Sequence, residues 1–406
     1  MNFKDDFPML NKGYIYFDNS ATTFKPYQVI DSISEYYESY SVNTHRGDYN
    51  LSHIADNKYE GVRDKVKTFI NASYSDEIVF TSGTTEGINM VVNGFFSDFL
   101  KDGDEVLLTK SEHASLLLPW FILQKKKKIL IKYIELDGDY KVTIQNVKKS
   151  ITSKTKVIAL AHITNVIGDI RPVKEICKLA KEKNILTVID GAQSVPHIKV
   201  DVKEIDADFY VFSGHKMCGP TGVGVLYGKY ELLNKVSPLI VGGGMNSYFT
   251  SDGHIDYKPL PSKLEAGTKD IAAIIGLGSA VDYLSNKGMN QIHEYVTNLK
   301  EYLLSRLKEI TDVTIYNPNS EGSIVIFNMN DPIKKEDKAH SQDVSIHLSK
   351  YGICIRSGDH CDKILYEVLN VTNTCRISLY FYNTKEEIDF FINVLKETKN
   401  IYDNIV

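Results

Sequence analysis

The sequence has no long apolar run, no internal repeat and no low-complexity segment. Because a helix needs about 18 consecutive apolar residues to cross a bilayer, no membrane span and no membrane partner is expected. Only five cysteines are spread over the 406 residues, and this odd number argues against a disulfide framework and favours a reduced, cytoplasmic setting. Residues 1–6 are acidic and lack the apolar core of a signal peptide.

Charge of neither sign is in large excess. The formal net charge is -5 at pH 7, which provides no overall attraction to nucleic acid or to anionic lipid. The one dense basic cluster is a run of four lysines at 125–128, between a helical stretch and an apolar strand. Its position favours a solvated turn over a partner-binding patch, so no nucleic-acid partner is expected.

The chain does contain a regular alternation of apolar strands and helices. Strands are predicted at residues 77–80, 105–109, 129–135, 156–162, 185–190, 208–212 and 223–227. Helical periodicity separates several of them, for example at 173–183. The alternation predicts an α/β fold in which a mainly parallel, seven-stranded sheet carries helices on both faces. We expect this large domain to span residues 13–286.

A smaller α+β domain is predicted over residues 287–406. It follows two long helical patterns at 271–285 and 289–310. Its expected strands and helices lie at 323–328, 342–351, 353–356, 376–380 and 385–399. Residues 1–12 are expected to pack against this domain.

Ligands of parallel α/β sheets bind beyond the carboxyl ends of the strands. The polar residues that follow the predicted strands are therefore the first candidates for a site. They are Thr84, Thr85, Glu112, His113, Asn165, Asp190, Gln193, Ser213, His215 and Lys216. A polar pair in an earlier loop, His45 and Arg46, is either solvated or meets an anion.

Four of these residues suit a cofactor, and each also has an ordinary explanation. The Gly- and Thr-rich turn at Thr84 joins a strand to a helix and suits a phosphate, although an N-capped helix has the same pattern. Lys216 suits a Schiff base with an aldehyde, although a lone lysine there is usually a turn residue on the surface. Asp190 ends an all-apolar strand and could bind a pyridinium nitrogen or cap a helix. His113 could stack on such a ring and move protons, or be a loop histidine. Together they form the set that a pyridoxal 5'-phosphate site needs.

A candidate nucleophile, Cys361, lies far along the chain. It follows a glycine turn, with His360 and Arg356 nearby to favour the thiolate. The alternatives are an inert buried cysteine or a metal ligand together with Cys354 and His360. No compact set of four ligands is visible, so no metal site is expected.

Short sequence strings spread in order along nearly the whole chain resemble those of the class V, fold-type I pyridoxal-phosphate enzymes. They resemble most of all those of the Suf-type (group II) cysteine desulfurases. The matching strings are residues 17–19, 45–47, 80–86, 112–113, 164–166, 188–193, 212–227, 265–268, 356–361 and 376–384.

The resemblance implies a role for each candidate. Lys216 would hold the cofactor as a Schiff base, Asp190 would bind its pyridine nitrogen and His113 would stack on its ring. Gln193 would contact the phenolic oxygen. The phosphate would be held by Thr84, Thr85, Ser213 and His215, with Thr268 from the partner subunit of a homodimer. The implied substrate-binding residues are Asn165, Arg376, Arg356, His45 and Arg46, of which Asn165 and Arg376 would hold the substrate carboxylate.

The implied activity is conversion of L-cysteine to L-alanine. The sulfur would pass through a persulfide on Cys361 to an acceptor protein, for iron–sulfur cluster or other sulfur-compound biosynthesis. The other hypotheses are a selenocysteine lyase, another C–S lyase or an aminotransferase of the same family, and a cofactor-free scaffold. Asp359 replaces a commoner histidine or amide, and Asp362 replaces a small residue. Carboxylates on both sides of Cys361 are expected to disfavour its thiolate.

Overall fold

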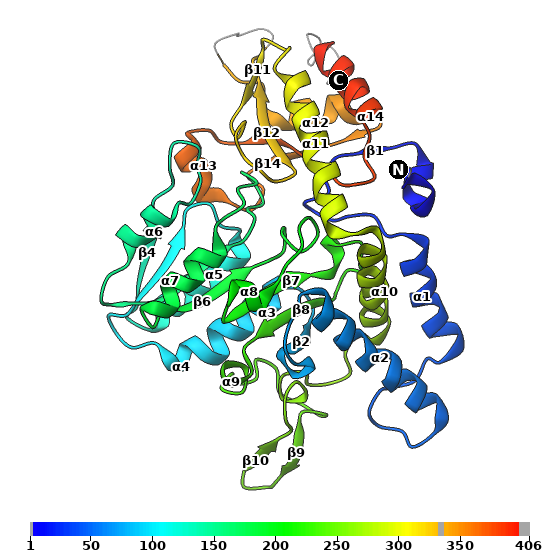
Figure 1. Ribbon diagram of the computed structural model, residues 1–406, viewed down its shortest axis with the longest axis vertical. Helices are drawn as coiled ribbons and strands as arrows, with labels where there is room; N and C mark the ends of the chain where they lie inside the picture. Colours follow the sequence, from blue (N-terminus) through cyan, green and yellow to red (C-terminus); the bar gives the residue numbers. More distant parts are fainter. Residues whose placement is uncertain (1–2, 332–336, 398–406) are drawn as a thin grey trace.

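A mainly parallel sheet of seven strands forms the centre of the larger part of the molecule (Figure 1). The computed structural model describes residues 3–331 and 337–397. The strands of this sheet are β2 (Ile78–Thr81), β3 (Glu105–Thr109), β4 (Leu130–Ile134), β5 (Thr155–Ala161), β6 (Leu186–Asp190), β7 (Phe209–Ser213) and β8 (Gly224–Gly228). They lie in the order β2-β8-β7-β6-β5-β3-β4, and only the two pairs that β8 makes are antiparallel. The predicted sheet is confirmed, and each strand begins and ends within one residue of its prediction.

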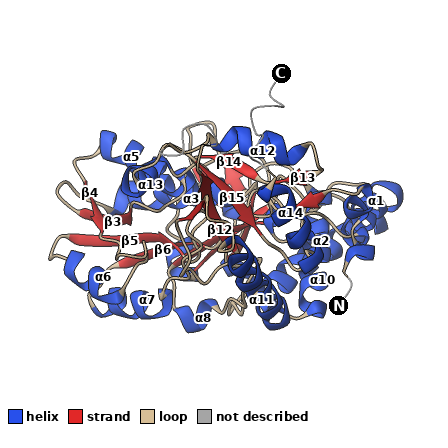
Figure 2. Ribbon diagram, turned by 90° about the horizontal axis from the view of Figure 1, so that it is seen from above, coloured by secondary structure: helices blue, strands red, loops and turns tan. Residues whose placement is uncertain are grey.

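Helices cover both faces of the sheet (Figure 2), because successive residues of a strand point to opposite sides. Val188 of β6 belongs to an apolar cluster with α3 (Thr84–Val91) and α5 (Ala114–Lys126). The next residue, Ile189, belongs to the cluster on the other face, with α7 (Val173–Glu182). Burial on both faces explains why the central strands are continuous apolar runs in the sequence.

The remaining helices of the larger part lie around this sheet. They are α1 (Tyr27–Ser39), α2 (Asn50–Phe69), α4 (Ser97–Phe99), α6 (Ile144–Ser150), α8 (Val202–Ile205), α9 (Tyr230–Leu233) and α10 (Ile271–Lys287). Within the residues that the structure describes, no helix has both the length and the apolar composition that a bilayer span requires.

A second, antiparallel sheet forms the upper part of the molecule in Figure 1. Its order is β11-β12-β15-β14, from the strands β11 (Val313–Ile315), β12 (Ile324–Met329), β14 (Arg356–Gly358) and β15 (Thr374–Ser378). The helices of this part are α11 (Met289–Leu307), α12 (Ser341–Ser349), α13 (Lys363–Leu369) and α14 (Lys385–Lys396).

The N-terminal segment joins this second part. The strand β1 (Ile15–Tyr16) pairs in parallel with β13 (Ile353–Cys354). Phe3 packs edge-on against Phe381, with the ring centroids 5.2 Å apart. The single strand predicted at 353–356 is therefore wrong in detail: β13 pairs with β1, and after Ile355 the chain changes partner, so that β14 pairs with β15. The division into domains at 286/287 stays a prediction, and its residues 1–2, 332–336 and 398–406 lie outside the described residues.

Several elements have no counterpart in the sequence prediction, among them α2 and the hairpin of β9 (Asn246–Phe249) and β10 (Ile255–Tyr257). α2 is 20 residues long and mostly polar. Its buried residues Ala55, Tyr59, Val62 and Val66 nevertheless follow the helical spacing, which is the signal that could have revealed it. The hairpin of β9 and β10 projects from the body of the molecule (Figure 1).

A buried ion pair fixes α2 to the sheet and to the loop before α10. Arg63 of α2 bonds Glu265 through both terminal nitrogens, at 2.9 and 3.0 Å, and also donates to the carbonyl of Ile78. Glu265 in turn accepts from the backbone N–H of Phe80 at 2.6 Å. The cation and the carboxylate are almost fully buried, so each depends on the other.

Removing Glu265 is expected to destabilise the fold strongly. Glu265→Ala removes the buried carboxylate of the Arg63 guanidinium and leaves it with the half-exposed Glu60, 2.8 Å from its Nε, a loss of about 3 kcal/mol. The midpoint of thermal unfolding measures the loss. The control is Glu204→Ala, which removes an exposed pair with Lys174 and should leave the midpoint nearly unchanged. Equal midpoints for the two variants would contradict this account.

Candidate active site

A pocket of about 200 Å³ opens beyond the carboxyl ends of β3, β5, β6 and β7. The site residues predicted from the sequence that line it are Thr84, Thr85, His113, Asn165, Asp190, Gln193, Ser213, His215, Lys216, Arg356, Cys361 and Arg376. Further lining residues that the prediction did not assign to the site are Ser20, Ala21, Ser115, Ala161, Ile163, Ala192 and His360. The pocket therefore combines residues that lie hundreds of positions apart.

Lys216 and Asp190 lie at the ends of neighbouring parallel strands. Asp190 is the last residue of β6 and pairs in register with Val211 of β7, and Lys216 follows in the turn after β7. Burial raises the pKa of the Asp190 carboxyl, one oxygen of which accepts from the N–H of Ala192 at 2.9 Å. Burial lowers the pKa of Lys216 to about 8, and the nearby Asp190 opposes this shift. A substantial fraction of the amine is therefore neutral and nucleophilic near neutral pH.

His113 presents a neutral imidazole to the pocket. It caps the N-terminus of α5, where its Nδ1 accepts from the N–H of Ser115 at 3.1 Å. Because Nδ1 is an acceptor, the proton of the neutral ring lies on Nε2. Burial, and then the charge of Lys216, lower the pKa of His113 to about 4. The ring is thus uncharged at neutral pH and suited to stacking on an aromatic ligand.

The turn into α3 has the features of a phosphate site. The N–H and hydroxyl of Thr84 both contact the Ser213 hydroxyl, at 2.8 and 2.7 Å. The N–H groups of the first helical turn lack partners within the helix and point toward an anion. Glycine is required here: a Cβ at Gly224 would lie 2.5 Å from the Cα of Gly83, which itself has φ +155°.

Two arginines of the second sheet form the opposite wall. Arg356 of β14 lies directly across from Arg376 of β15 in the antiparallel register. Both pair with Asp18, at 3.7 and 3.0 Å, and Arg376 also donates to the carbonyl of Asn165 at 2.9 Å. The sequence prediction gave Asp18 no role. The signal for it is its position at the end of a short strand, beside the small sheet.

The loop that carries Cys361 reaches from the second sheet to the first. The thiol residue is exposed, and its carbonyl accepts from the N–H of Ala114 at 2.8 Å. The carbonyl of His360 accepts from Asn165 at 2.9 Å. Both His360 and Cys361 have positive φ. This unfavourable backbone conformation places Cys361 at the pocket that Lys216 also lines.

The prediction that His360 favours the thiolate of Cys361 is wrong. Burial, and then Arg376, hold the pKa of His360 well below its usual range, so the ring is neutral and supplies no positive charge. Arg356 also lines the pocket. Burial raises the pKa of the Asp362 carboxyl well above its usual range, which weakens its expected effect on the thiolate. The expected effect of Asp359 stays a prediction. Among the described residues, no three His, Cys, Asp or Glu side chains gather in a way that could hold a metal ion.

Three predicted residues do not line the pocket. His45 lies 3.2 Å from Glu60, and Thr268 accepts from Asn43 at 3.3 Å. Arg46 lies beside the backbone of Gly243 and Gly244. All three are exposed.

The pocket fits pyridoxal phosphate. It contains an amine for the aldehyde, a buried carboxyl for the ring nitrogen, a neutral ring for stacking and a glycine-lined helix start for the phosphate. Gln193, whose Nε2 donates to the carbonyl of Ser20 at 2.9 Å, borders the same space.

Comparisons with known proteins agree with this geometry. Residues 15–391 match the family model "Aminotransferase class-V". A probable cysteine desulfurase from Halalkalibacterium halodurans is 41% identical over 406 residues, covering 98% of each chain. The apo structure of a cysteine desulfurase from Thermococcus onnurineus superposes with a TM-score of 0.92 at 36% identity, covering 98% of this chain and 97% of the other. A cysteine desulfurase from Escherichia coli, solved as an S-sulfonic acid, has a TM-score of 0.91 at 32% identity and 98% coverage of both chains.

Both the length and the sequence identity of these matches show the family. The matched residues cover almost the whole chain, including both of its main sheets. The chain belongs to the class-V aminotransferase family, and it is a pyridoxal-phosphate enzyme of the cysteine desulfurase type.

Proposed function

We propose that this enzyme removes sulfur from L-cysteine, transfers it to Cys361 and releases L-alanine. The observation that carries the proposal is the position of Cys361, an exposed thiol on the wall of the pocket that contains Lys216 and Arg376. The other four cysteines do not line this pocket, and three of them are buried. The printed names of the relatives, cysteine desulfurases, support the same substrate.

The cofactor would be held by residues from four strand ends. Lys216 would bind its aldehyde carbon, Asp190 its ring nitrogen and His113 its ring face, and Gln193, which lines the same pocket, would contact its phenolic oxygen. The phosphate would lie at the start of α3, with Thr84, Thr85, Ser213 and His215 as donors. When bound, pyridoxal phosphate supplies an electron sink that makes the carbon atoms next to the substrate nitrogen acidic.

The substrate carboxylate would be held by Arg376. Its guanidinium offers a planar fork, and Asn165 and Asp18 already fix its orientation through bonds of 2.9 and 3.0 Å. Arg356 lies beside it and is part of the pocket wall. Cys361 lines the same pocket as both arginines, so its thiol would lie within the space that holds the substrate.

Protons would be moved by Lys216, whose pKa of about 8 suits a group that accepts and returns a proton near neutral pH. The Cys361 thiolate then attacks the sulfur of L-cysteine. An S–S bond forms and the C–S bond of the substrate breaks. The electron pair remains on the carbon side, which takes up a proton and becomes alanine. Cys361 is left as a persulfide.

We further infer that the enzyme acts as a homodimer in the cytoplasm and passes its sulfur to an acceptor protein, for iron–sulfur cluster assembly, as a Suf-type enzyme. Support for the dimer comes from His45, Arg46 and Thr268, which lie outside the pocket of their own chain. The hairpin β9–β10 also exposes large apolar side chains, with Phe249 66% exposed. A thiol nucleophile that must stay reduced supports the cytoplasm.

Cys361→Ala is expected to abolish sulfur transfer and to spare cofactor binding. Removing the nucleophile should lower the rate of alanine release from L-cysteine by more than about 10³-fold. The absorbance of bound cofactor should not change. Mass spectrometry of the cysteine-treated parent should find the sulfur adduct on Cys361. The control is Cys354→Ala, at a half-buried thiol on β13. Full activity of Cys361→Ala would disprove the proposal.

Loading of the cofactor should accelerate as pH rises. Only the neutral amine attacks an aldehyde, and the pKa of Lys216 is about 8. The loading rate of the apoenzyme should therefore change about tenfold per pH unit below this value and level off above it. The absorbance of bound cofactor measures the rate. Lys216→Ala is the control and should form no borohydride-stable bond. A rate that does not depend on pH in this range would contradict the account.

Mixed dimers test whether the partner completes the site. Lys216→Ala and Arg46→Ala homodimers should each be inactive. If Arg46 serves the partner's pocket, random mixed dimers have one intact site in half of the molecules and recover about a quarter of the parent activity. If Arg46 serves its own chain, mixing restores nothing. Size-exclusion chromatography confirms that the mixed dimers form.

A further inference from the structure

The residue after the nucleophile, Asp362, is buried without a partner. It is 1% exposed, and neither of its carboxyl oxygens has a hydrogen-bond partner in the described part of the chain. A carboxylate in this position would lose its hydration free energy without gaining a hydrogen bond, whereas a neutral carboxylic acid has far less hydration free energy to lose. The place therefore selects the protonated form, and burial raises the pKa of Asp362 well above its usual range.

Charged groups from two other elements face Asp362. Glu112, just after β3, raises its pKa further, and Arg171, just before α7, lowers it. Within its own segment, Asp359 also raises this pKa, and Tyr366 of α13 lies within electrostatic range. Arg171 is the cation of this group. Asp362 would therefore have a counter-ion only if Arg171 were not already paired with Glu112.

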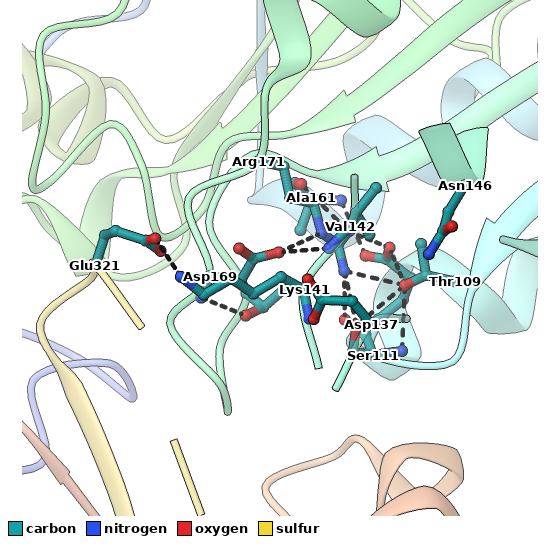
Figure 3. A network of polar contacts seen from close by, with 12 residues as sticks. Thr109, Ser111, Asp137, Lys141, Val142, Asn146, Ala161, Asp169, Arg171 and Glu321 are labelled. Atoms are coloured by element: carbon teal, nitrogen blue, oxygen red, sulfur yellow. Dashed lines mark hydrogen bonds and ion pairs between the residues drawn. The ribbon is translucent and has the colours of Figure 1, made fainter. Parts of the chain in front are cut away.

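Arg171 is already occupied. Its terminal nitrogens bond the carboxylate of Glu112 and the hydroxyls of Thr109 and Ser111, the latter two at 3.0 and 2.8 Å. Its Nε lies 3.6 Å from Asp169. Figure 3 shows this guanidinium among its partners, with Asp169 on one side and Thr109 and Ser111 on the other. One cation therefore lies among three carboxyl groups.

Glu112 and Asp362 differ in the donors around them. Glu112 accepts from Arg171, from the hydroxyl of Thr109 at 2.7 Å and from the N–H of Ala161 at 2.9 Å. Burial raises the pKa of Glu112, and these donors oppose that shift. The carboxyl oxygens of Asp362 make no hydrogen bond in the described part of the chain, and the nearby backbone N–H of Leu365 opposes but does not cancel the effect of burial on its pKa. The neutral acid therefore belongs at Asp362.

Backbone bonds and apolar packing attach the Cys361 segment to the larger part of the molecule. The bonds run from Ala114 to the carbonyl of Cys361 and from Asn165 to the carbonyl of His360. The apolar packing begins at Ile364, which lies against the cluster that contains residues of α3 and α5. The positive φ of His360 and Cys361 opposes this conformation. Within residues 359–362 the buried side chains are those of His360 and Asp362, so the burial of Asp362 belongs to this closed conformation of the loop.

We propose that Asp362 is a positioning residue for Cys361: while it is protonated the loop closes against the Glu112–Arg171 pair, and when it releases its proton to solvent the loop opens. The closed loop holds Cys361 at the pocket wall. The open loop presents it to an acceptor, a consequence that rests on the proposed function. Asp362 acts through the backbone of its neighbour and touches no substrate.

The direction of the pH effect follows from the sign of the shift. The closed loop binds the proton of Asp362 more tightly than the open loop does, where the carboxyl has its ordinary pKa near 3.8. Closure is therefore complete below that value and is lost as pH rises toward the raised value. Each pH unit in this interval increases the ratio of open to closed loop by up to about tenfold.

Hydrogen exchange of the holoenzyme tests the proposal. The exchange rate of the peptide that contains residues 356–366 is measured against pH for the parent and for Asp362→Asn, an isosteric side chain that cannot ionise. Dividing the exchange rate of the parent by that of Asp362→Asn removes the intrinsic pH dependence of exchange. The ratio should rise with pH by up to about tenfold per unit and then level off. The matched control is Asp359→Asn, an exposed carboxyl of the same loop. It should keep the pH transition and move it to lower pH, because Asp359 contributes to the raised pKa of Asp362.

A ratio that stays constant with pH would overturn the proposal. So would a pH dependence that persists in Asp362→Ala, which removes the carboxyl altogether and serves as the second variant if Asp362→Asn does not fold. The alkylation rate of Cys361 by iodoacetamide, read by peptide mass spectrometry, should lose the same pH transition in both variants. None of these measurements requires turnover, so they decide the loop's behaviour even if Cys361 accepts no sulfur.

Discussion

Asp190 lies between Ala161 of β5 and Val211 of β7, in the register of three parallel strands. This pairing brings the carboxyl ends of β6 and β7 side by side, and Lys216 follows in the turn after β7. The separation between the buried carboxyl and the amine therefore depends on the strand spacing and on the short turn Gly214–Lys216 that follows β7. The pocket, the position of His113 after β3 and the helix start at Thr84 all depend on the same sheet edge.

Removal of charged groups from water gives these residues their chemistry. Lys216 is held partly neutral, Asp190 has a raised pKa and His113 is kept uncharged, in each case mainly by burial. The protein stabilises these unfavourable states through the apolar clusters on both faces of the sheet. A well-packed core therefore maintains a site whose own groups are poorly solvated.

The second sheet supplies the other half of the pocket. Register places Arg356 opposite Arg376, and Asp18 from the N-terminal segment holds both. Two backbone carbonyls of the Cys361 loop bond Ala114 and Asn165, which follow β3 and β5, and Asp362 of the same loop is buried. Arginines on a rigid sheet suit the fixed recognition of a carboxylate, whereas a thiol on a loop suits a group that must meet two different partners.

The sequence by itself determined the seven strands and the identity of the residues at their ends. Central parallel strands are buried on both faces, so they leave continuous apolar runs that need no tertiary information. It also indicated Lys216, Asp190 and His113, because polar residues directly after such strands must gather at one edge. It did not reveal α2, whose apolar residues are too sparse to stand out among its polar ones.

Only the tertiary structure decided the electrostatics around Cys361. In the sequence, His360 is a neighbouring base and Asp362 a neighbouring negative charge. In the fold both are buried, which lowers the pKa of His360 and raises the pKa of Asp362. The role of Asp18 and the change of partner between β13 and β14 were likewise set by pairing between distant strands. Charge state and pairing depend on which groups are brought close and removed from water, and this is a property of the fold that no local pattern carries.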